Sequence, residues 1–303
     1  MGTRGSDLAR TQTEAVIAQL QAKYPELGVE VRVIRTKGDI MQDVALAKIG
    51  GKGFFVKEIE EALLRGEIDL AVHSMKDMPV GFPAGLLIGA MPAREDPRDV
   101  LISKDRLKIE ELPQRARLGT GSLRRRLQLA RLLPDVVVVP LRGNIDTRIR
   151  KIEREALDGV ILAAAGMRRM GRVQQVAQFI PVEVLLPAVG QGALGIEVRR
   201  DDDETRALIA FLDHPPTRAQ VGAERAFLQR LGGGCQLPVA AYAEWRGGEL
   251  AMCALLGNPD GTYIIQEEQR APTADGERLG REVAERILGR GGRQILAELY
   301  ESC

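Results

Sequence analysis

Cys235 stands directly after a run of three glycines, in the stretch RLGGGCQLPV at residues 230–239. Flanking glycines leave room for a bulky group bonded to the sulfur, and an activated thiolate is a nucleophile. The sequence holds 3 cysteines and 2 histidines. The odd count and the lack of CxxC spacing argue against a disulfide framework and against a zinc site. No catalytic histidine is evident nearby in the sequence, so a functional cysteine and a tolerated loop thiol both stay open.

A second chemical signal is a set of arginines at expected helix starts, each marked by glycine or a hydroxyl-bearing side chain. Exposed N–H groups at a helix start bind anions, and arginine adds bidentate recognition of carboxylate or phosphate. The four segments are TRGS with Arg4 and Ser6, GTGSLRR with Thr120, Ser122, Arg124 and Arg125, LRGNIDTR with Arg142, Gly143, Asn144 and Arg148, and AAGMRR with Arg168 and Arg169. Any one of these arginines alone fits a solvated surface position. Four repeats at equivalent places favour a cleft for a ligand with many negative groups.

Lys76 and Asp77 follow an expected buried strand in the stretch AVHSMKDMP at residues 71–79. A lysine and an aspartate in a turn are usually solvated, which is the alternative reading. A carboxylate placed at the end of a strand can stabilise a cation or transfer protons, with the lysine beside it.

Two glycine-rich stretches look like nucleotide-binding loops but are excluded. GQGALG at residues 190–195 is followed by an alternating, strand-like pattern, whereas the dinucleotide fingerprint needs a helix there. GGKGFF at residues 50–55 has no serine or threonine after its lysine, so it is not a phosphate-binding P-loop.

The composition excludes several classes of partner. Lys plus Arg number 43 against 42 Asp plus Glu, so no overall field attracts nucleic acid or an anionic membrane. Aromatic residues make up 4% of the chain, too few for base-stacking platforms. The segment MGTRGSDLAR lacks the apolar core of a signal peptide, and no apolar run reaches transmembrane length. We expect a soluble, cytoplasmic protein without a metal site.

The pattern of the first third of the chain predicts alternating helices and strands. We expect a helix from Ser6 or Asp7 to about Lys23, a strand at 29–34, a long loop at 36–54, and a helix at 54–66. Two buried strands follow at 68–74 and 85–92. Alternation of this kind is typical of parallel α/β units.

A second set of strands and helices covers 99–166, and the apolar pattern at 185–199 returns the chain to the first set. Helices are then expected at 201–214 and 216–231, followed by three antiparallel strands at about 239–246, 249–257 and 262–270 and two final helices. The predicted fold class is therefore α/β, with two doubly wound domains and a small α+β domain. The predicted domains are residues 1–92 with 193–213, residues 93–192, and residues 214–303.

Taken in order along the chain, these motifs resemble hydroxymethylbilane synthase, also called porphobilinogen deaminase. The motifs are GTRGS, GGKGFFVKEIE, DLAVHSMKDMP, EDPRDV, GTGSLRRRLQL, LRGNIDTR, LPAVGQGALGIE and GGGCQLPVAAYA. They cover essentially the whole chain, and eight motifs in the family's order make a chance match very improbable. The resemblance implies two periplasmic-binding-protein-like domains and a smaller third domain.

The resemblance also implies a chemistry. In this family the cysteine that matches Cys235 holds a dipyrromethane cofactor through a thioether, and the enzyme is a transferase of porphyrin and heme biosynthesis. It condenses four porphobilinogen molecules head to tail onto the cofactor, releases ammonia and hydrolyses off the linear tetrapyrrole. Each pyrrole carries acetate and propionate, which matches the anionic ligand that the arginines predict.

The matched motifs assign further roles. Asp77 and Lys76 match catalytic positions, where the aspartate would bind pyrrole N–H groups and stabilise the cation left by deamination. Positions matching cofactor contacts are Cys235, Ser6, Lys76, Asp77, Thr120, Ser122, Arg124, Arg125, Arg142 and Gly143. Positions matching substrate contacts are Arg4, Arg142, Arg148, Arg169, Gln191 and Phe55. Lys48 and Lys52 fall in a segment that would cover the site.

Two other classes explain part of the pattern. A non-catalytic bilobal anion-binding protein would account for the α/β domains and the arginines but not for Cys235. A regulatory effector-binding domain should bring a helix-turn-helix, which the sequence does not show. We therefore expect an enzyme, acting as a monomer on porphobilinogen, with no nucleic-acid or membrane partner.

Overall fold

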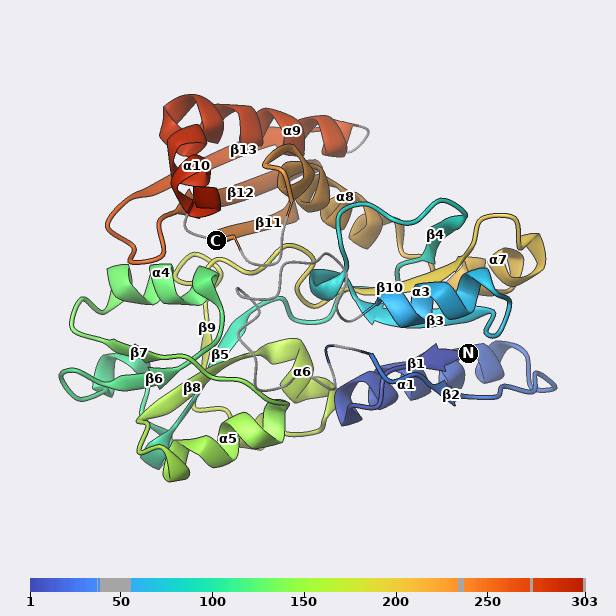
Figure 1. Ribbon diagram of the computed structural model, residues 1–303, viewed down its shortest axis with the longest axis horizontal. Coiled ribbons are helices and arrows are strands. Elements are labelled where there is room, and N and C mark those ends of the chain that lie inside the picture. Colours follow the sequence, from blue (N-terminus) through green and yellow to red (C-terminus); the bar gives the residue numbers. More distant parts are fainter. Residues whose placement is uncertain (37, 39–55, 234–236, 273–274, 302–303) are drawn as a thin grey trace.

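The computed structural model describes residues 1–36, 38, 56–233, 237–272 and 275–301. These residues form three β-sheets, each with its own helices. Figure 1 shows the elements of the third sheet (β11–β13 with α8–α10) above those of the second (β5–β9 with α4–α6). The elements of the first sheet lie to the right of both in that view.

The first sheet has the strand order β2-β1-β3-β10-β4, and helices cover both of its faces. β1 pairs in parallel with β2 and β3, whereas β10 runs antiparallel to both β3 and β4. Helix α1 packs Val16 and Leu20 against one face of β3, and α3 packs Ile59 and Leu63 against the other. The strands are β1 (Gly2–Thr3), β2 (Arg32–Val33), β3 (Leu70–Ser74), β4 (Leu86–Ala90) and β10 (Leu194–Arg199), and the helices are α1 (Asp7–Lys23), α3 (Lys57–Leu64) and α7 (Asp203–Ile209).

The second sheet repeats this plan with the order β7-β6-β8-β5-β9. β6 is parallel to β7 and β8, and β5 is antiparallel to β8 and β9. The strands are β5 (Asp99–Ser103), β6 (Arg117–Gly119), β7 (Val137–Val139), β8 (Gly159–Ala163) and β9 (Gln178–Ile180), and the helices are α4 (Leu123–Leu132), α5 (Ile145–Arg154) and α6 (Ala164–Arg169). In each of these two sheets one strand, β10 in the first and β5 in the second, runs antiparallel to both of its neighbours.

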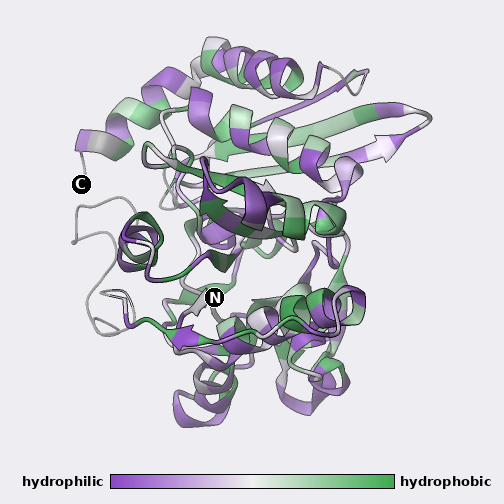
Figure 2. Ribbon diagram, turned by 90° about the vertical axis from the view of Figure 1, so that its right-hand side faces the viewer, coloured by the Kyte–Doolittle hydropathy of each residue, from purple (hydrophilic) through white to green (hydrophobic). Residues whose placement is uncertain are grey.

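The third sheet is an antiparallel meander of β11 (Val239–Arg246), β12 (Glu249–Gly257) and β13 (Ile264–Ala271). One of its faces is covered by α8 (Pro215–Arg230) and α9 (Gly276–Ile287), which bury Phe227 and Val283 against Leu250 and Met252. A short π-helical segment, Leu288–Gly292, joins α9 to α10 (Arg293–Glu301). Helix α9 buries one side, including Leu279, Val283 and Ile287, and keeps charged residues on the other, as an amphipathic helix does. Both hydrophilic and hydrophobic colours therefore appear along the helices of this part of the molecule (Figure 2).

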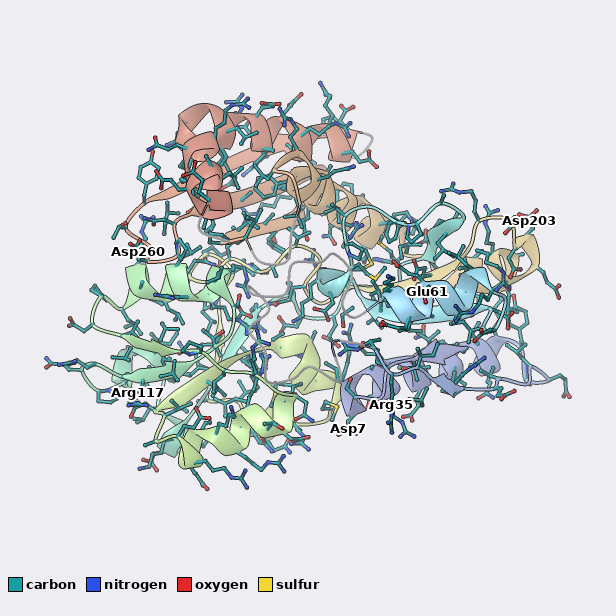
Figure 3. The ribbon with its side chains drawn as sticks, viewed as in Figure 1. Asp7, Arg35, Glu61, Arg117, Asp203 and Asp260 are labelled. Carbon is teal, nitrogen blue, oxygen red and sulfur yellow. The ribbon has the colours of Figure 1, made fainter. Side chains whose placement is uncertain are left out.

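The opposite face of the third sheet packs on the second sheet's helix α4. Leu127 and Leu186 form one cluster there with Ala240 and Leu255. The turn between β12 and β13 also reaches α4, because a Cβ atom at Gly261 (φ +74°) would lie 2.5 Å from the carbonyl oxygen of Leu127. Figure 3 shows the neighbouring Asp260 beside the same helix.

The predicted α/β class and the C-terminal three-stranded antiparallel sheet are confirmed. The domain boundaries stay a prediction, although β10 does join the first sheet. Among the described residues, every helix is too short or too polar to cross a lipid bilayer.

Three details differ from the sequence-based expectation. The predicted strand at 29–34 shrinks to Arg32–Val33, because its neighbour β1 offers only Gly2 and Thr3 as partners. The strand predicted to run through residue 166 ends at Ala163, where α6 begins. The first two sheets are mixed rather than wholly parallel, since a pattern of alternating apolar residues does not show in which direction a strand runs.

Candidate active site

Lys76 and Asp77 lie on a short 3-10 turn, Met75–Asp77, that directly follows the buried strand β3. The turn is fixed from the β10 side, where the backbone N–H of Met75 donates to the carbonyl of Ala193 at 3.0 Å. Gly190 (φ +70°) allows a close approach, because a Cβ atom there would lie 2.9 Å from the Cβ of Met75. Met75 is buried, whereas Lys76 is partly and Asp77 well exposed. The fold thus presents both predicted catalytic side chains outward from a rigid base.

Charges from both sheets act on Lys76. Desolvation lowers the pKa of Lys76 to about 8, although the side chain keeps some contact with solvent. The neighbouring Asp77 raises this pKa and Arg125 lowers it, and Asp99 and Arg124 act as a further opposed pair. The turn after β3 is thus coupled electrostatically to buried charged residues of the second sheet.

Arg148 belongs to the same electrostatic cluster. Burial lowers the pKa of Arg148 to about 10, with further lowering by Arg125 and Arg142 and an opposing effect of Asp77. Asp77 therefore influences a lysine of its own sheet and an arginine of α5, in the second sheet. Lys76, Asp77, Arg125, Arg142 and Arg148 are thus linked by their charges, and their assignment to one site stays a prediction.

Arg124 and Arg125 are nearly buried and share one carboxylate. Nη1 of Arg124 donates to Oδ2 of Asp99 at 2.8 Å, and Nη2 of Arg125 donates to Oδ1 at 2.7 Å. Burial of the Asp99 carboxyl raises its pKa, but the charges and hydrogen bonds of the two arginines outweigh that effect and hold the pKa below its usual range. Sequence reasoning missed Asp99, although it opens the buried strand DVLIS, where a carboxylate needs a partner.

The hydroxyl groups predicted at helix starts act as caps. Ser6 Oγ accepts the N–H of Ala9 at 3.3 Å at the start of α1, and Ser122 Oγ accepts the N–H of Arg125 at 3.4 Å at the start of α4. Thr120 Oγ1 accepts the N–H of Ser122 at 3.3 Å. These contacts fix the two helix starts that the sequence assigned to anion binding.

At the start of α5, Asn144 is the capping residue and accepts the N–H of Thr147 at 2.8 Å. Gly143 has φ +108°, and a Cβ atom there would lie 2.7 Å from Cγ2 of Thr147, so only glycine fits. Nε of Arg148 donates to the carbonyl of Gly143 at 2.8 Å. The turn therefore orients Arg148 as well as starting the helix.

Gln191 and Arg169 lie at the crossover between the two sheets. Nε2 of Gln191, a residue only 1% exposed, donates to the carbonyl of Pro97 at 2.7 Å and to Oδ1 of Asp99 at 3.0 Å. Nη2 of Arg169 donates to the carbonyl of Gly192 at 2.7 Å, and burial lowers the pKa of Arg169 while Glu95 raises it. In this structure the hydrogen bonds of Gln191 and Arg169 stabilise the crossover between the two sheets, in addition to any contact with a substrate.

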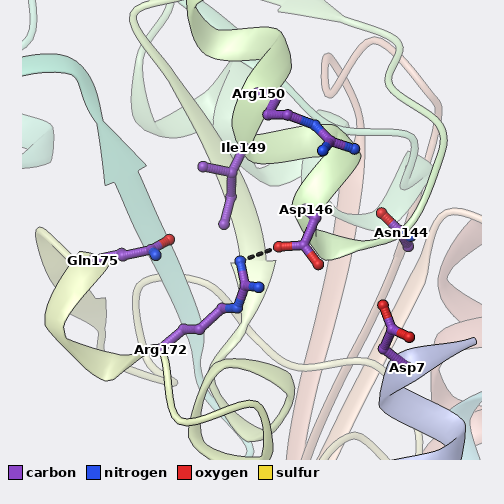
Figure 4. Close-up of a pocket in the computed structure, with 7 residues that line it drawn as sticks. All are labelled: Asp7, Asn144, Asp146, Ile149, Arg150, Arg172 and Gln175. Atoms are coloured by element: carbon purple, nitrogen blue, oxygen red, sulfur yellow. Dashed lines mark ion pairs between the residues drawn. The ribbon is translucent and has the colours of Figure 1, made fainter.

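A pocket of about 480 Å³ lies where α1 meets the second sheet's helices (Figure 4). Asp7 of α1 faces Asn144 and Asp146 of α5 across it, and Arg172 pairs with Asp146. A larger one, about 1530 Å³, lies at the far end of the first sheet, between strand residues 28–33 and α7. Of the residues that the sequence singled out, only Asn144 lines either of these two pockets, so the candidate site is defined by its charges.

Cys235, Phe55, Lys48 and Lys52 lie outside the described residues. The last described residue before Cys235 is Gly233 (φ +57°), where a Cβ atom would lie 2.5 Å from Cγ2 of Val80. Nη2 of Arg225 also donates to the carbonyl of Val80 at 3.0 Å. Val80 is three residues beyond Asp77. The backbone at Gly233 thus lies against the segment that follows the turn carrying Lys76 and Asp77.

Comparisons with known proteins show a family relationship over most of the chain. The family model described as "Porphobilinogen deaminase, dipyromethane cofactor binding domain" matches residues 1–207, and the one described as "Porphobilinogen deaminase, C-terminal domain" matches residues 219–289. A porphobilinogen deaminase of Syntrophus aciditrophicus (strain SB) is 57% identical over 301 residues, which cover 99% of this chain and 98% of that protein. The porphobilinogen deaminase of Pelobacter propionicus is 51% identical over 301 residues, with 99% and 97% covered.

Similarity to solved structures is much weaker. The BvgS periplasmic VFT2 domain of Bordetella pertussis is 16% identical, covers 65% of this chain and 74% of that chain, and has a TM-score of 0.38. At that level the similarity does not bear on the fold.

Proposed function

The chain belongs to the porphobilinogen deaminase family, and we propose that Asp77 and Lys76 carry its chemistry beside the arginines of the second sheet. The observation that carries the proposal is the electrostatic influence of Asp77 on both Lys76 and Arg148. These two groups belong to different sheets, so the aspartate acts where the two halves of the site meet.

The reaction follows from the family. The protein is a transferase of tetrapyrrole biosynthesis that condenses four porphobilinogen molecules head to tail, releases ammonia and hydrolyses off linear hydroxymethylbilane. Its residues 1–207 form a dipyrromethane cofactor-binding domain. A non-catalytic binding protein is not favoured, because relatives named as the enzyme match the full length of the chain.

Asp77 acts by charge in this proposal. When the protonated amino group of the aminomethyl side chain of porphobilinogen leaves as ammonia, the methylene carbon stays on the pyrrole, and the remaining pyrrole carries a positive charge. The surrounding arginines bind carboxylates but repel a cation, so a nearby anion is required. Asp77 supplies that anion at a fixed position, and such preorganised charge is typically the largest single contribution to a rate.

Lys76 is the proton-carrying partner. Its pKa of about 8 leaves the ammonium group mainly protonated at pH 7, yet able to exchange its proton near neutrality. As an ammonium it binds carboxylates or delivers a proton to the departing amine. Asp77 lies one residue away and supports the charged form.

The residues present fit a dipyrromethane group, which when bound supplies the pyrrole to which the first substrate is joined. Its carboxylates need cationic donors, and the buried Nε of Arg124 has no hydrogen-bond partner among the described residues. We propose that Ser6, Thr120, Ser122, Arg125, Arg142 and Gly143 contribute to its binding. We propose that Arg4, Arg148, Arg169 and Gln191 bind substrate.

We also propose that Cys235 attaches the cofactor. The contact of Gly233 with Val80 supports this assignment, because two residues of extended chain span at most about 7 Å. The thiol would therefore lie within reach of a ligand held beside Asp77.

The test of the catalytic role is ammonia release in a single turnover by Asp77→Asn. The variant keeps the shape of the side chain and loses its charge, and it should release ammonia at least about a hundredfold more slowly. Intact mass must first show that the variant carries its cofactor, since protein without it would be inactive for another reason. Asp77→Glu should fall between the two.

Asp203→Asn is the matched control, since Asp203 lies on the exposed helix α7 (Figure 3) and pairs only with a surface arginine among the described residues. It should react like the unmodified protein. A rate of Asp77→Asn close to that control would show that Asp77 is not the catalytic carboxylate.

We propose further that the protein is a cytoplasmic monomer without nucleic-acid or membrane partners. The near-zero net charge of the chain supports the absence of such partners. Sedimentation equilibrium gives the mass of the assembly, and a dimer mass would contradict the proposal.

A further inference from the structure

Asp99 is the most heavily engaged carboxylate beside the candidate site. It is fully buried, and it opens β5 at the point where the chain enters the second sheet. Its Oδ2 accepts Nη1 of Arg124 at 2.8 Å, and its Oδ1 accepts Nε and Nη2 of Arg125 at 3.1 and 2.7 Å. Oδ1 also accepts Nε2 of Gln191 at 3.0 Å. One carboxylate thus holds three side chains at once.

The two arginines are not equivalent within this arrangement. All three nitrogens of the Arg125 guanidinium donate inside the protein, since its Nη1 reaches the carbonyl of Ile161 at 2.8 Å. Arg124 uses Nη1 for Asp99 and for the carbonyl of Leu186 at 2.7 Å. Its Nε is buried without a hydrogen-bond partner among the described residues. A buried donor without a partner costs free energy that a ligand acceptor would recover.

We propose that Asp99 is a positioning residue for the reaction, which fixes Arg125 as part of the frame and holds Arg124 with a donor ready for a ligand carboxylate. This inference rests on the proposed role of the arginines in binding the cofactor and substrate. It adds that Asp99, without contacting the ligand, lowers the net positive charge that Arg124 and Arg125 present to it. Asp99 leaves the pair with one net positive charge instead of two.

The charge balance has a physical reason. Two guanidinium groups buried side by side repel each other, and each is costly to remove from water. A carboxylate between them offsets both effects and sets their orientation through bidentate geometry. The hydrogen bond from Gln191 then ties this unit to the crossover between the sheets.

Lys76 supplies a readout that a purely structural role would not change. Asp99 favours the protonated form of Lys76, and Arg124 and Arg125 oppose it, so the pKa of Lys76 reports the charge of the whole unit. Limited acylation at a series of pH values, followed by peptide mass spectrometry, measures the fraction of Lys76 that is deprotonated. This measurement does not depend on activity.

The experiment uses Asp99→Asn, which keeps the shape of the side chain and removes its charge. Lys76 in this variant should reach half-maximal labelling at a lower pH than in the unmodified protein. The fraction of protein carrying cofactor should fall, and the KM for porphobilinogen of the loaded fraction should rise about 10- to 100-fold with a smaller change in kcat. Asp99→Glu restores the charge on a longer side chain, so it should restore the labelling of Lys76 but only part of the KM.

Asp96→Asn is the control. Asp96 is also largely buried and lies three residues away, but it pairs with Arg98 and Arg168. It should change neither the labelling of Lys76 nor the KM. A folded Asp99→Asn protein that matches Asp96→Asn in both measurements overturns the proposal.

If Asp99→Asn does not fold, the double variant Asp99→Asn/Arg125→Met removes one charge of each sign and keeps the net charge of the unit. It should fold and still raise the KM, because Arg124 has lost its tether. A double variant with an unchanged KM overturns the proposal.

Arg124→Leu separates this inference from the proposed function. Arg131→Leu is its control, on an exposed residue of the same helix. If Arg124→Leu assembles cofactor and binds substrate as well as Arg131→Leu does, the proposed role of the arginine fails. If Arg124→Leu is impaired and Asp99→Asn is not, only the role of Asp99 fails.

Discussion

At the scale of single residues, Cys253 and Cys235 differ in the part of the chain that carries each of them. Cys253 lies on β12, partly buried, and accepts a hydrogen bond from Nε2 of Gln266 at 3.2 Å. Burial raises the pKa of the Cys253 thiol, so it is a poor nucleophile near neutrality. Gly233, two residues before Cys235, has a positive φ and lies against Val80. The two thiols should therefore behave differently.

Cys235→Ala should fold but lack the extra mass of two pyrrole units, and it should not react with a pyrrole-detecting aldehyde reagent. Cys253→Ala is the matched control and should keep both properties. Intact mass spectrometry of the two purified variants decides the question. Retention of the added mass by Cys235→Ala would assign the attachment to another residue.

The arrangement of the site could be predicted from the sequence where it depends on local signals. Lys76 and Asp77 follow a buried strand, and Ser6, Ser122 and Asn144 cap helices, as short-range patterns indicated. Asp99 could not be found in this way. Its partners lie 25 and 26 residues further along the chain, and only the packing of α4 against the sheet brings them together.

At the scale of elements, helix α3 buries a carboxyl of its own against two titratable groups on the first sheet. Glu60 of α3 is 8% exposed, and His73 of β3 lies 2.9 Å from Oε2 of Glu197 on β10. Apart from this contact with His73, neither oxygen of Glu197 has a polar partner among the described residues. Desolvation, aided by the charge of Glu197, raises the pKa of Glu60 to about 7. The buried carboxyl of Glu60 therefore keeps its proton up to near-neutral pH.

This arrangement makes stability depend on pH. Because the pKa of Glu60 is raised in the folded protein, the folded state binds more protons than the unfolded state between about pH 4.5 and 7. Stability should fall as the pH rises through that window and then stay level. Glu60→Gln removes the titration, so the variant should gain stability relative to the unmodified protein from pH 5 to pH 8, by at most about 3 kcal/mol.

Urea denaturation at a series of pH values measures this gain. Glu61→Gln is the control on the same helix, since Glu61 is exposed, as Figure 3 shows, and pairs with Lys57 and Arg65. Its pH dependence should match that of the unmodified protein. A parallel pH profile for Glu60→Gln would rule out the buried proton.

Element boundaries were predictable where a strand has full-length neighbours. The three strands of the third sheet lie within two residues of their expected ends. The strand expected at 29–34 was too long because pairing, which the sequence pattern does not contain, limits β2 to two residues. The short strand β9 was missed for the same reason, since only its contact with β5 makes it a strand.

At the scale of the whole molecule, one buried glutamate joins the crossover between the sheets to the third sheet. Glu224 of α8 is fully buried and accepts Nη1 of Arg94 at 2.6 Å. It also accepts the backbone N–H groups of Gly190 at 2.7 Å and Ala243 at 2.9 Å. Residues from three separate parts of the chain therefore depend on one carboxylate.

Glu224→Gln should destabilise the protein by about 3–5 kcal/mol, because it leaves the buried charge of Arg94 without its partner. Glu285→Gln is the control, since Glu285 pairs with Arg230 at the exposed surface and should lose less than about 1 kcal/mol. Guanidinium denaturation gives both values. Equal losses in the two variants would show that Glu224 does not hold the three parts together.

The position of β10 also has a consequence for how the chain is made. β10 lies between β3 and β4 in the first sheet, yet it begins at Leu194, about 100 residues after β4 ends at Ala90. At roughly 5–20 residues per second, a ribosome needs roughly 5–20 s to synthesise that stretch. All five strands of the second sheet lie inside it, so the second sheet can fold while the first still lacks the strand between β3 and β4. Until β10 is synthesised, the nascent N-terminal segment exposes the β3 and β4 edges that β10 later pairs with, and unpaired strand edges are prone to aggregation.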